Sequence, residues 1–245
     1  MSDRRIFGLS ISPLTAGQIA DKIVDGPPPV GGPGLIVTPN IQHIALLRGN
    51  PAFRRAYDHA AEIVCDGFPV HYYAKLRGAP SPERVTGCDI AIDIMNRRVF
   101  PAQHRFFFVV DSEAAAAAIR AWAEERGLAS QTAVPDFGFE KDAARSDALV
   151  AAIAAHRTTI LFMGLGAPKS EVFIDAHRDR LPPCWALCVG QAVKMALGLV
   201  PTPPALVKAL NLEWAWRMVL EPRRMIGRYV HSVVGFLAAV ARDLR

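Results

Sequence analysis

The chain has 245 residues, of which 51% are hydrophobic and 21% charged, a composition that excludes a disordered chain and allows a sizeable core. It contains no run of about 18 apolar residues, so we expect no transmembrane helix, and the N-terminal stretch MSDRRIFGLSIS lacks the apolar segment of a signal peptide. The four cysteines form no C-x-x-C pair, which favours free thiols in a reducing compartment over disulfides or a metal site.

Strand and helix signals alternate along most of the chain. Short β-branched and aliphatic runs predict strands, whereas capped amphipathic segments predict helices. Helix starts are indicated by a capping box from Thr15 to Gln18, by Asn50 before Pro51, and by Ser112. In chain order we expect a strand over 4–11, a helix over 15–26, a strand over 34–38, helices over 41–48 and from 50, a strand over 61–65, a helix from near 88, a strand over 104–111, a helix after 112, a strand over 131–135, a helix over 141–157, and strands over 158–164 and 184–190.

This alternation predicts an α/β fold, with a Rossmann-like, largely parallel sheet flanked by helices over residues 1–200. From about Pro201 the strand signal ends, and residues 201–245 are expected to form a helical appendage of two or three helices, broken at Pro222. The apolar stretch YVHSVVGFLAAVA has only 13 residues, too few to span a bilayer but enough to lie at its interface.

The net charge of +5 is concentrated in the appendage. Residues 205–245 hold seven Lys and Arg against three Asp and Glu, whereas the rest of the chain holds 21 against 20. A basic segment can meet nucleic acid, anionic lipid or a phosphorylated ligand. Because this segment is rich in Trp, Leu, Met and Val and lacks the lysine density of nucleic-acid platforms, it favours an anionic membrane surface, and no nucleic acid is expected.

The stretch FMGLGAPKSE, residues 162–171, reads as a turn from a buried strand to a helix. Pro168 suits the first turn of a helix, and a helix N-terminus presents free N–H groups that can bind an anion. In parallel sheets, ligands bind beyond the carboxyl ends of the strands. This turn and two further strand ends, residues 38–40 and 66–67, therefore form the candidate site.

Five motifs make a family resemblance specific. They are VTPNIQHI, CDGFPVHYYAKLRG, ERVTGCDI, GLGAPKSE and NLEWAWRMVLEPRRMIGRYV, in this order. Over about residues 30–230 the chain resembles the WecG/TagA/CpsF family of bacterial glycosyltransferases, which act in surface-polysaccharide synthesis. The resemblance implies an inverting, metal-independent transfer from a UDP-sugar to a sugar on undecaprenyl diphosphate, a polyprenyl diphosphate, without a cofactor.

The resemblance also implies a place in the cell. It makes residues 1–200 the catalytic domain and residues 201–245 an appendage that docks the protein peripherally on the cytoplasmic face of the inner membrane. The apolar appendage needs a membrane or a partner to cover it, so a homo-oligomer is a further possibility.

Inverting transfer needs a base that takes a proton from the acceptor hydroxyl, together with positive charge or N–H dipoles facing the diphosphate leaving group. The resemblance places the base at Asp66, which ends a predicted strand and precedes a glycine that leaves room for a substrate. A turn-forming Asp-Gly pair is the alternative. No D-x-D motif occurs and the seven histidines are scattered, so we expect no metal site.

The other candidates surround the donor or its diphosphate. Thr38, Asn40 and Thr86 can equally cap helices, and the arginines can equally form solvated surface. The predicted substrate-binding residues are Thr38, Asn40, Arg84, Thr86, Gly87, Gly164, Gly166, Lys169, Ser170, Glu171, Gln191 and Lys194. The predicted contacts to diphosphate or membrane are Arg217, Arg223, Arg224 and Arg228.

Two departures from the family pattern leave a second function open. Ser170 replaces the glutamine of G-x-P-x-Q-E, while Val193 and Lys194 replace a usual Phe-Asp pair. The reversed charge at Lys194 favours either a different donor, such as an acidic sugar, or reduced activity. The alternative is therefore a non-catalytic, membrane-associated protein that binds a nucleotide sugar or a lipid headgroup.

Overall fold

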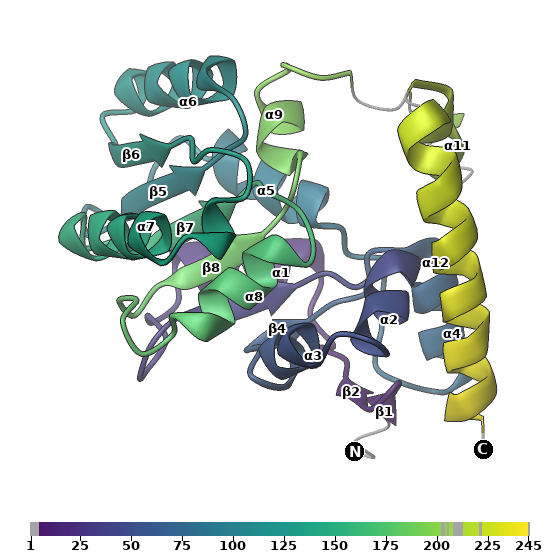
Figure 1. Ribbon diagram of the computed structural model, residues 1–245. Coiled ribbons are helices and arrows are strands. Elements are labelled where there is room, and N and C mark those ends of the chain that lie inside the picture. The colour runs from purple at the N-terminus through teal and green to yellow at the C-terminus, as the bar shows by residue number, and fades with distance from the viewer. Residues whose placement is uncertain (1–4, 202–203, 205, 208–212, 221, 245) are drawn as a thin grey trace.

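The computed structural model describes residues 5–201, 204, 206–207, 213–220 and 222–244. Within these residues one sheet has six strands: β3 (Gly34–Val37), β4 (Glu62–Ile63), β5 (Arg105–Val109), β6 (Ala129–Ala133), β7 (Ile160–Met163) and β8 (Trp185–Cys188). All pairings are parallel and the spatial order is β4-β3-β8-β7-β5-β6. The predicted α/β, Rossmann-like fold is confirmed (Figure 1).

Helices cover both faces of this sheet (Figure 1). One buried cluster joins the sheet to α1 (Ala16–Val24), α5 (Gly87–Asn96), α6 (Glu113–Glu125) and α9 (Ala192–Ala196). The other joins it to α2 (Ile41–Leu47), α3 (Pro51–Asp58), α4 (Phe68–Leu76), α7 (Ala143–Ala155) and α8 (Lys169–Ala176). In β5, Phe106 and Phe108 enter the first cluster and Phe107 the second, because successive strand residues point to opposite faces.

The predicted caps are confirmed. Thr15 and Gln18 form a capping box at α1, Asn50 caps α3 ahead of Pro51, and the Ser112 side chain caps α6. Each side chain satisfies N–H groups that a helix start leaves free, so these residues fix where the helices begin.

The strand predicted over 4–11 is instead a hairpin of β1 (Arg5–Ile6) and β2 (Leu9–Ser10). Phe7 and Gly8 have φ angles of +54° and +71°, so the chain reverses where the apolar pattern alone predicts continuous strand. Helices α4 and α9 have no counterpart among the sequence predictions.

Two described helices follow Pro201: α11 (Glu213–Leu220) and α12 (Pro222–Asp243), which begins at the predicted break. The carboxyl-terminal half of α12 packs on α2, where a Cβ on Gly235 would lie 2.4 Å from the Cβ of Ala45. The Asp243 carboxylate accepts from Phe7 N at 2.6 Å and from Tyr73 Oη at 2.8 Å. None of the described helices combines the length and apolar character needed to cross a bilayer.

Candidate active site

The candidate site lies where strands β3 and β8 end side by side. The chain leaves β3 toward α2 and leaves β8 toward α9, which packs in the other buried cluster. The connections after β3 and β8 therefore run to opposite faces of the sheet, and ligands bind at the carboxyl edge of a parallel sheet where neighbouring connections diverge in this way. Gly87, at the start of α5, lies against both strand ends, since an added Cβ would be 3.4 Å from Thr38 Oγ1 and 3.3 Å from Val189 Cγ1. The structure thus brings Thr38 and Gly87 together.

Asp66 lies beside the end of β3. Its backbone N–H donates to Pro39 O at 3.2 Å, and a Cβ on Gly67 would lie 3.1 Å from the Cβ of Asn40. Asp66 is half-buried, so the residue is neither sealed in the core nor fully in solvent. Two separate sequence motifs therefore meet at one edge.

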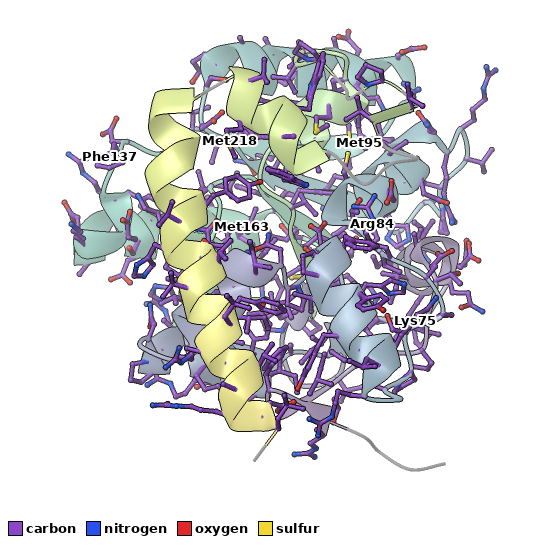
Figure 2. All side chains as sticks on the ribbon, turned by 90° about the vertical axis from the view of Figure 1, so that its right-hand side faces the viewer. Lys75, Arg84, Met95, Phe137, Met163 and Met218 are labelled. Atoms are coloured by element: carbon purple, nitrogen blue, oxygen red, sulfur yellow. The ribbon has the colours of Figure 1, made fainter. Side chains whose placement is uncertain are left out.

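Arg84 adds a cation to this edge. Its Nη1 donates to the backbone oxygen of Asp66 at 3.4 Å, and the neighbouring Val85 N–H donates to Cys65 O at 2.9 Å. Figure 2 shows Arg84 at the amino-terminal end of α4. Helix α4 starts two residues after Asp66, and Gly67 at its N-cap position provides no side-chain hydrogen bond. A guanidinium and a helix start without a side-chain cap thus lie beside the backbone of Asp66, a combination suited to an anion.

Asn40 and Thr86 act as helix caps. The Asn40 side chain accepts from Gln42 N at 2.9 Å and His43 N at 3.2 Å. Thr86 Oγ1 accepts from Asp89 N at 2.9 Å and donates to the Asp89 carboxylate at 2.7 Å. The capping alternative is therefore present at both positions, and it fixes the starts of α2 and α5 at the rim of the site.

The turn after β7 forms the next part of the rim. A Cβ on Gly164 would lie 3.0 Å from Val109 O and 3.2 Å from Gly190 O, so this position admits only glycine without displacement. Gly166 has a φ of +83°, a left-handed conformation that also favours glycine. Lys169 is turned outward to Glu140, with an Nζ–Oε1 distance of 3.0 Å.

Ser170 and Glu171 lie beneath this rim. They are 0% and 1% exposed, and Ser170 Oγ lies 3.5 Å from Met163 O. Among the described residues, Glu171 Oε2 has no hydrogen-bond partner, and burial raises the pKa of this carboxyl to about 7. In this structure both residues support the wall of the site, and direct contact with a substrate stays a prediction.

Asp111 contacts two of the predicted site residues, although the sequence predictions did not include it. Its carboxylate forms an ion pair with Lys194 and accepts from Gln191 Nε2 at 3.0 Å. Partial burial alone would raise the pKa of Asp111, but the hydrogen bonds from Lys194 and Gln191 hold it below its ordinary value. Asp111 directly follows the buried strand run RFFFVV, the same signal that singled out Asp66.

The four predicted arginines of the appendage lie on α11 and α12: Arg217, Arg223, Arg224 and Arg228. Their side chains fall outside the described residues. Among the side chains that the structure does describe, no three of His, Cys, Asp or Glu gather closely enough to hold a metal ion.

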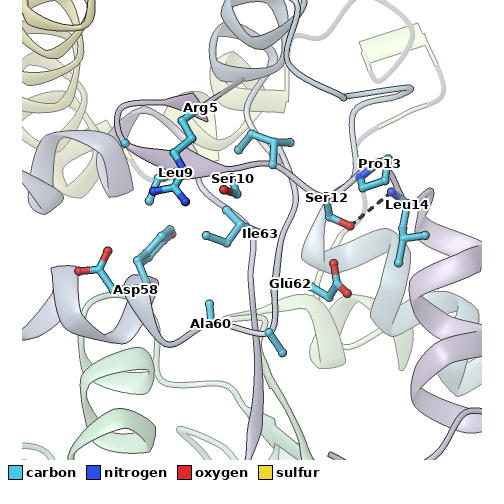
Figure 3. Close-up of a pocket in the computed structure, with 14 residues that line it drawn as sticks. Arg5, Leu9, Ser10, Ser12, Pro13, Leu14, Asp58, Ala60, Glu62 and Ile63 are labelled. Carbon is cyan, nitrogen blue, oxygen red and sulfur yellow. Dashed lines mark hydrogen bonds between the residues drawn. The ribbon is translucent and has the colours of Figure 1, made fainter. Parts of the chain in front are cut away.

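A cavity of about 510 Å³ lies elsewhere, at the β1–β2 hairpin (Figure 3). Arg5, Ser10, Ser12, Asp58 and Glu62 line it, and its described lining contains none of the predicted site residues. Its walls include Ala60 and Ala61, which lead into β4, so it opens at the entrance to that strand and away from Asp66, which follows the strand.

The fold defines a Rossmann-like α/β protein, and the strand-end loops place its candidate site at the carboxyl edge of the sheet. The chain belongs to the glycosyl transferase WecG/TagA/CpsF family, whose family model matches residues 4–245. The resemblance carried by the five motifs is thereby confirmed.

Curated relatives are named for one activity. A protein of Bacillus spizizenii is 26% identical over 197 residues, which are 80% of this chain and 74% of the relative. A protein of Staphylococcus aureus is 23% identical over 214 residues, 86% of this chain and 80% of the relative. Both are named N-acetylglucosaminyldiphosphoundecaprenol N-acetyl-beta-D-mannosaminyltransferase.

Proposed function

We propose that this protein transfers a sugar from a UDP-sugar to a sugar carried on undecaprenyl diphosphate, with inversion at the anomeric carbon and without a metal ion or other cofactor. The observation that carries the proposal is Asp66: a half-buried aspartate just before α4, whose backbone oxygen accepts from Arg84, in a chain of a glycosyltransferase family. The names of the relatives support N-acetylglucosaminyl diphosphoundecaprenol as the acceptor.

In the proposed reaction, the Asp66 carboxylate accepts the proton of the acceptor hydroxyl while the hydroxyl oxygen bonds to the anomeric carbon. The bond from that carbon to the diphosphate oxygen breaks, and UDP leaves with the electron pair. One displacement from the opposite face inverts the configuration. Arg84 and the first N–H groups of α4 would stabilise the charge that grows on the diphosphate.

The remaining residues would hold and enclose the donor. Thr38, Gly87, Gly164 and Gly166 would shape the pocket at the strand ends, and the arginines of α11 and α12 would bind the diphosphate of the donor or of the lipid. A lipid-linked acceptor stays in the membrane, so the protein would act peripherally on the cytoplasmic face of the inner membrane. The outer side of α12, which carries exposed valines and leucines, supports docking there.

The test is transfer of a radiolabelled sugar from UDP to N-acetylglucosaminyl diphosphoundecaprenol. Asp66→Asn keeps the size of the side chain but removes the base, so the rate should fall by about 10²- to 10⁴-fold without a change in thermal unfolding. Asp147→Asn, at an exposed position of α7, is the matched control and should keep full activity.

Full activity of Asp66→Asn would overturn the assignment of the base.

The departures at Ser170 and Lys194 favour a second candidate, a non-catalytic protein that binds nucleotide sugars or lipid headgroups. Wild-type protein that binds a UDP-sugar but yields no product with any donor would favour that candidate.

A further inference from the structure

Helix α4 carries apolar side chains on the side that faces away from the core. Phe68, Tyr72 and Leu76 are 46%, 61% and 71% exposed, and their spacing of four residues places them along one side of the helix. The rings of Phe68 and Tyr72 stack with centroids 6.1 Å apart. On the opposite side of the helix, Val70 and Tyr73 pack in the core. Burial in the fold therefore does not account for this outer stripe.

Helix α12 presents a second apolar stripe on the same side of the molecule. Figure 2 shows α4 and α12 next to each other, both toward the viewer. The hydrogen bond from Tyr73 Oη to Asp243 Oδ2 joins the two helices. The exposed side chains of the α12 stripe are Val230 at 62%, Val234 at 64% and Leu237 at 60%. The two stripes together form a surface, which we name the α4–α12 face, defined by Phe68, Tyr72, Leu76, Val230, Val234 and Leu237.

Exposed cations belong to both helices of this face. The nine residues of α4, FPVHYYAKL, contain Lys75 and no acidic residue, and Lys75 is exposed among the stripe residues. Arg242 is exposed near the end of α12. Aromatic and aliphatic side chains beside isolated cations are typical of surfaces that lie in the headgroup region of an anionic bilayer.

We infer that α4 is a membrane-contacting element of the catalytic domain, whose stripe enters the interfacial layer of an anionic bilayer beside α12. The inference rests on the proposed function, since it concerns how the enzyme meets a lipid-borne acceptor. It adds a second contact to the one predicted for residues 201–245.

This contact would set the depth of the active site. Helix α4 begins two residues after Asp66 and rises about 1.5 Å per residue, so its stripe extends over about 12 Å. With the stripe in the interface, Asp66 is held at the level of the headgroups, where the diphosphate of the acceptor lies. Docking through α12 alone would not fix the depth of Asp66 relative to the headgroups.

The experiment is flotation of the full chain with vesicles of phosphatidylglycerol and phosphatidylethanolamine. The double variant Tyr72→Ser, Leu76→Ser should lower the vesicle partition coefficient about tenfold. The two serines transfer much less apolar surface from water into the bilayer than the tyrosine and leucine they replace. Val30→Ser, Val99→Ser, at two exposed positions outside the α4–α12 face, is the matched control and should bind like the wild type. Thermal unfolding of each variant confirms that it is folded.

A second measurement separates this inference from the proposed function. The Tyr72, Leu76 variant should raise KM for an undecaprenyl acceptor in vesicles but leave transfer to a water-soluble short-chain acceptor unchanged. Lys75→Gln should weaken binding about fivefold to these anionic vesicles and leave binding to neutral phosphatidylcholine vesicles unchanged.

Wild-type vesicle binding by the double variant overturns the inference, and so does an equal loss in the control. A wild-type dimer in solution that the double variant dissociates also overturns it, since the stripe would then contact a second copy. If the wild type transfers sugar to neither acceptor, the proposed function fails, while the flotation result still decides the role of α4.

Discussion

Lys194 and Asp111 form an ion pair that connects α9, which follows β8, to the loop that follows β5. Strand β7 lies between those two strands in the sheet, so the pair passes across the end of β7 near Gly164. Gln191 reinforces the connection through its hydrogen bond to the same carboxylate. The cation at position 194, where the family usually has Asp, therefore already has a counter-charge within the chain.

Reversal of one charge in this pair should damage the donor pocket, and reversal of both should repair it. Lys194→Asp alone places two carboxylates side by side, so we expect KM for the donor to rise about tenfold. Asp111→Lys should have a similar effect, whereas the double reversal should recover most of the affinity. Steady-state kinetics of the four proteins measure the coupling between the two positions. Independent effects of the two substitutions would show that the pair does not shape the pocket.

The paired state of Lys194 also bears on donor choice. A cation neutralised by Asp111 offers little attraction to a carboxylate on a sugar, which argues for a neutral donor over an acidic one. We expect UDP-N-acetylhexosamines to raise the thermal unfolding midpoint more than UDP-hexuronic acids at equal concentration. UMP serves as the control for binding through the nucleotide alone. A larger stabilisation by the uronic acids would restore the acidic-sugar interpretation of Lys194.

The sequence predicts most of this site because strand ends are easy to locate. Buried apolar runs fix where β3 and β7 end, and parallel pairing brings their loops to one edge. The direction of side chains within a turn is harder to predict: Ser170 and Glu171, predicted to bind the substrate, are buried. The first turn of α8 packs them inward, while Lys169 faces out. Helix α4 escaped prediction because its apolar residues occupy both sides, so they give no amphipathic pattern.

Buried Glu171 should make the protein less stable as the pH rises. Its pKa is raised from 4.5 to about 7 in the folded chain. Between these pH values the unfolded chain loses the proton while the folded chain keeps it, so the free energy of unfolding falls with pH and levels off above about 7. The full effect is about 3 kcal/mol, since each pKa unit corresponds to about 1.4 kcal/mol.

Glu171→Gln cannot ionise and should lack this decline. Urea unfolding at pH 5 and pH 8 measures it, with Glu124→Gln at an exposed position of α6 as the control for loss of one acid. The same decrease in stability between the two pH values in wild type and Glu171→Gln would contradict the prediction.

The contact between α12 and α2 depends on the absence of a side chain at Gly235. A Cβ there would lie 2.4 Å from the Cβ and 3.2 Å from the Cα of Ala45, and neither atom can move without the helix. Gly235→Ala should therefore push the two helices apart and destabilise the protein by about 1–3 kcal/mol. Because Asn40 caps α2 at the rim of the site, transfer activity should fall as well.

Gly227→Ala is the matched control in the same helix. An added Cβ there meets no described atom within 4 Å, so the intrinsic helix preference of alanine should leave stability unchanged or raise it by about 0.5–1 kcal/mol. Urea unfolding and limited proteolysis within α12 compare the two variants. If both alanines stabilise the protein alike, α12 does not pack on α2 through Gly235, and the docked position of the C-terminal helix would have to be abandoned.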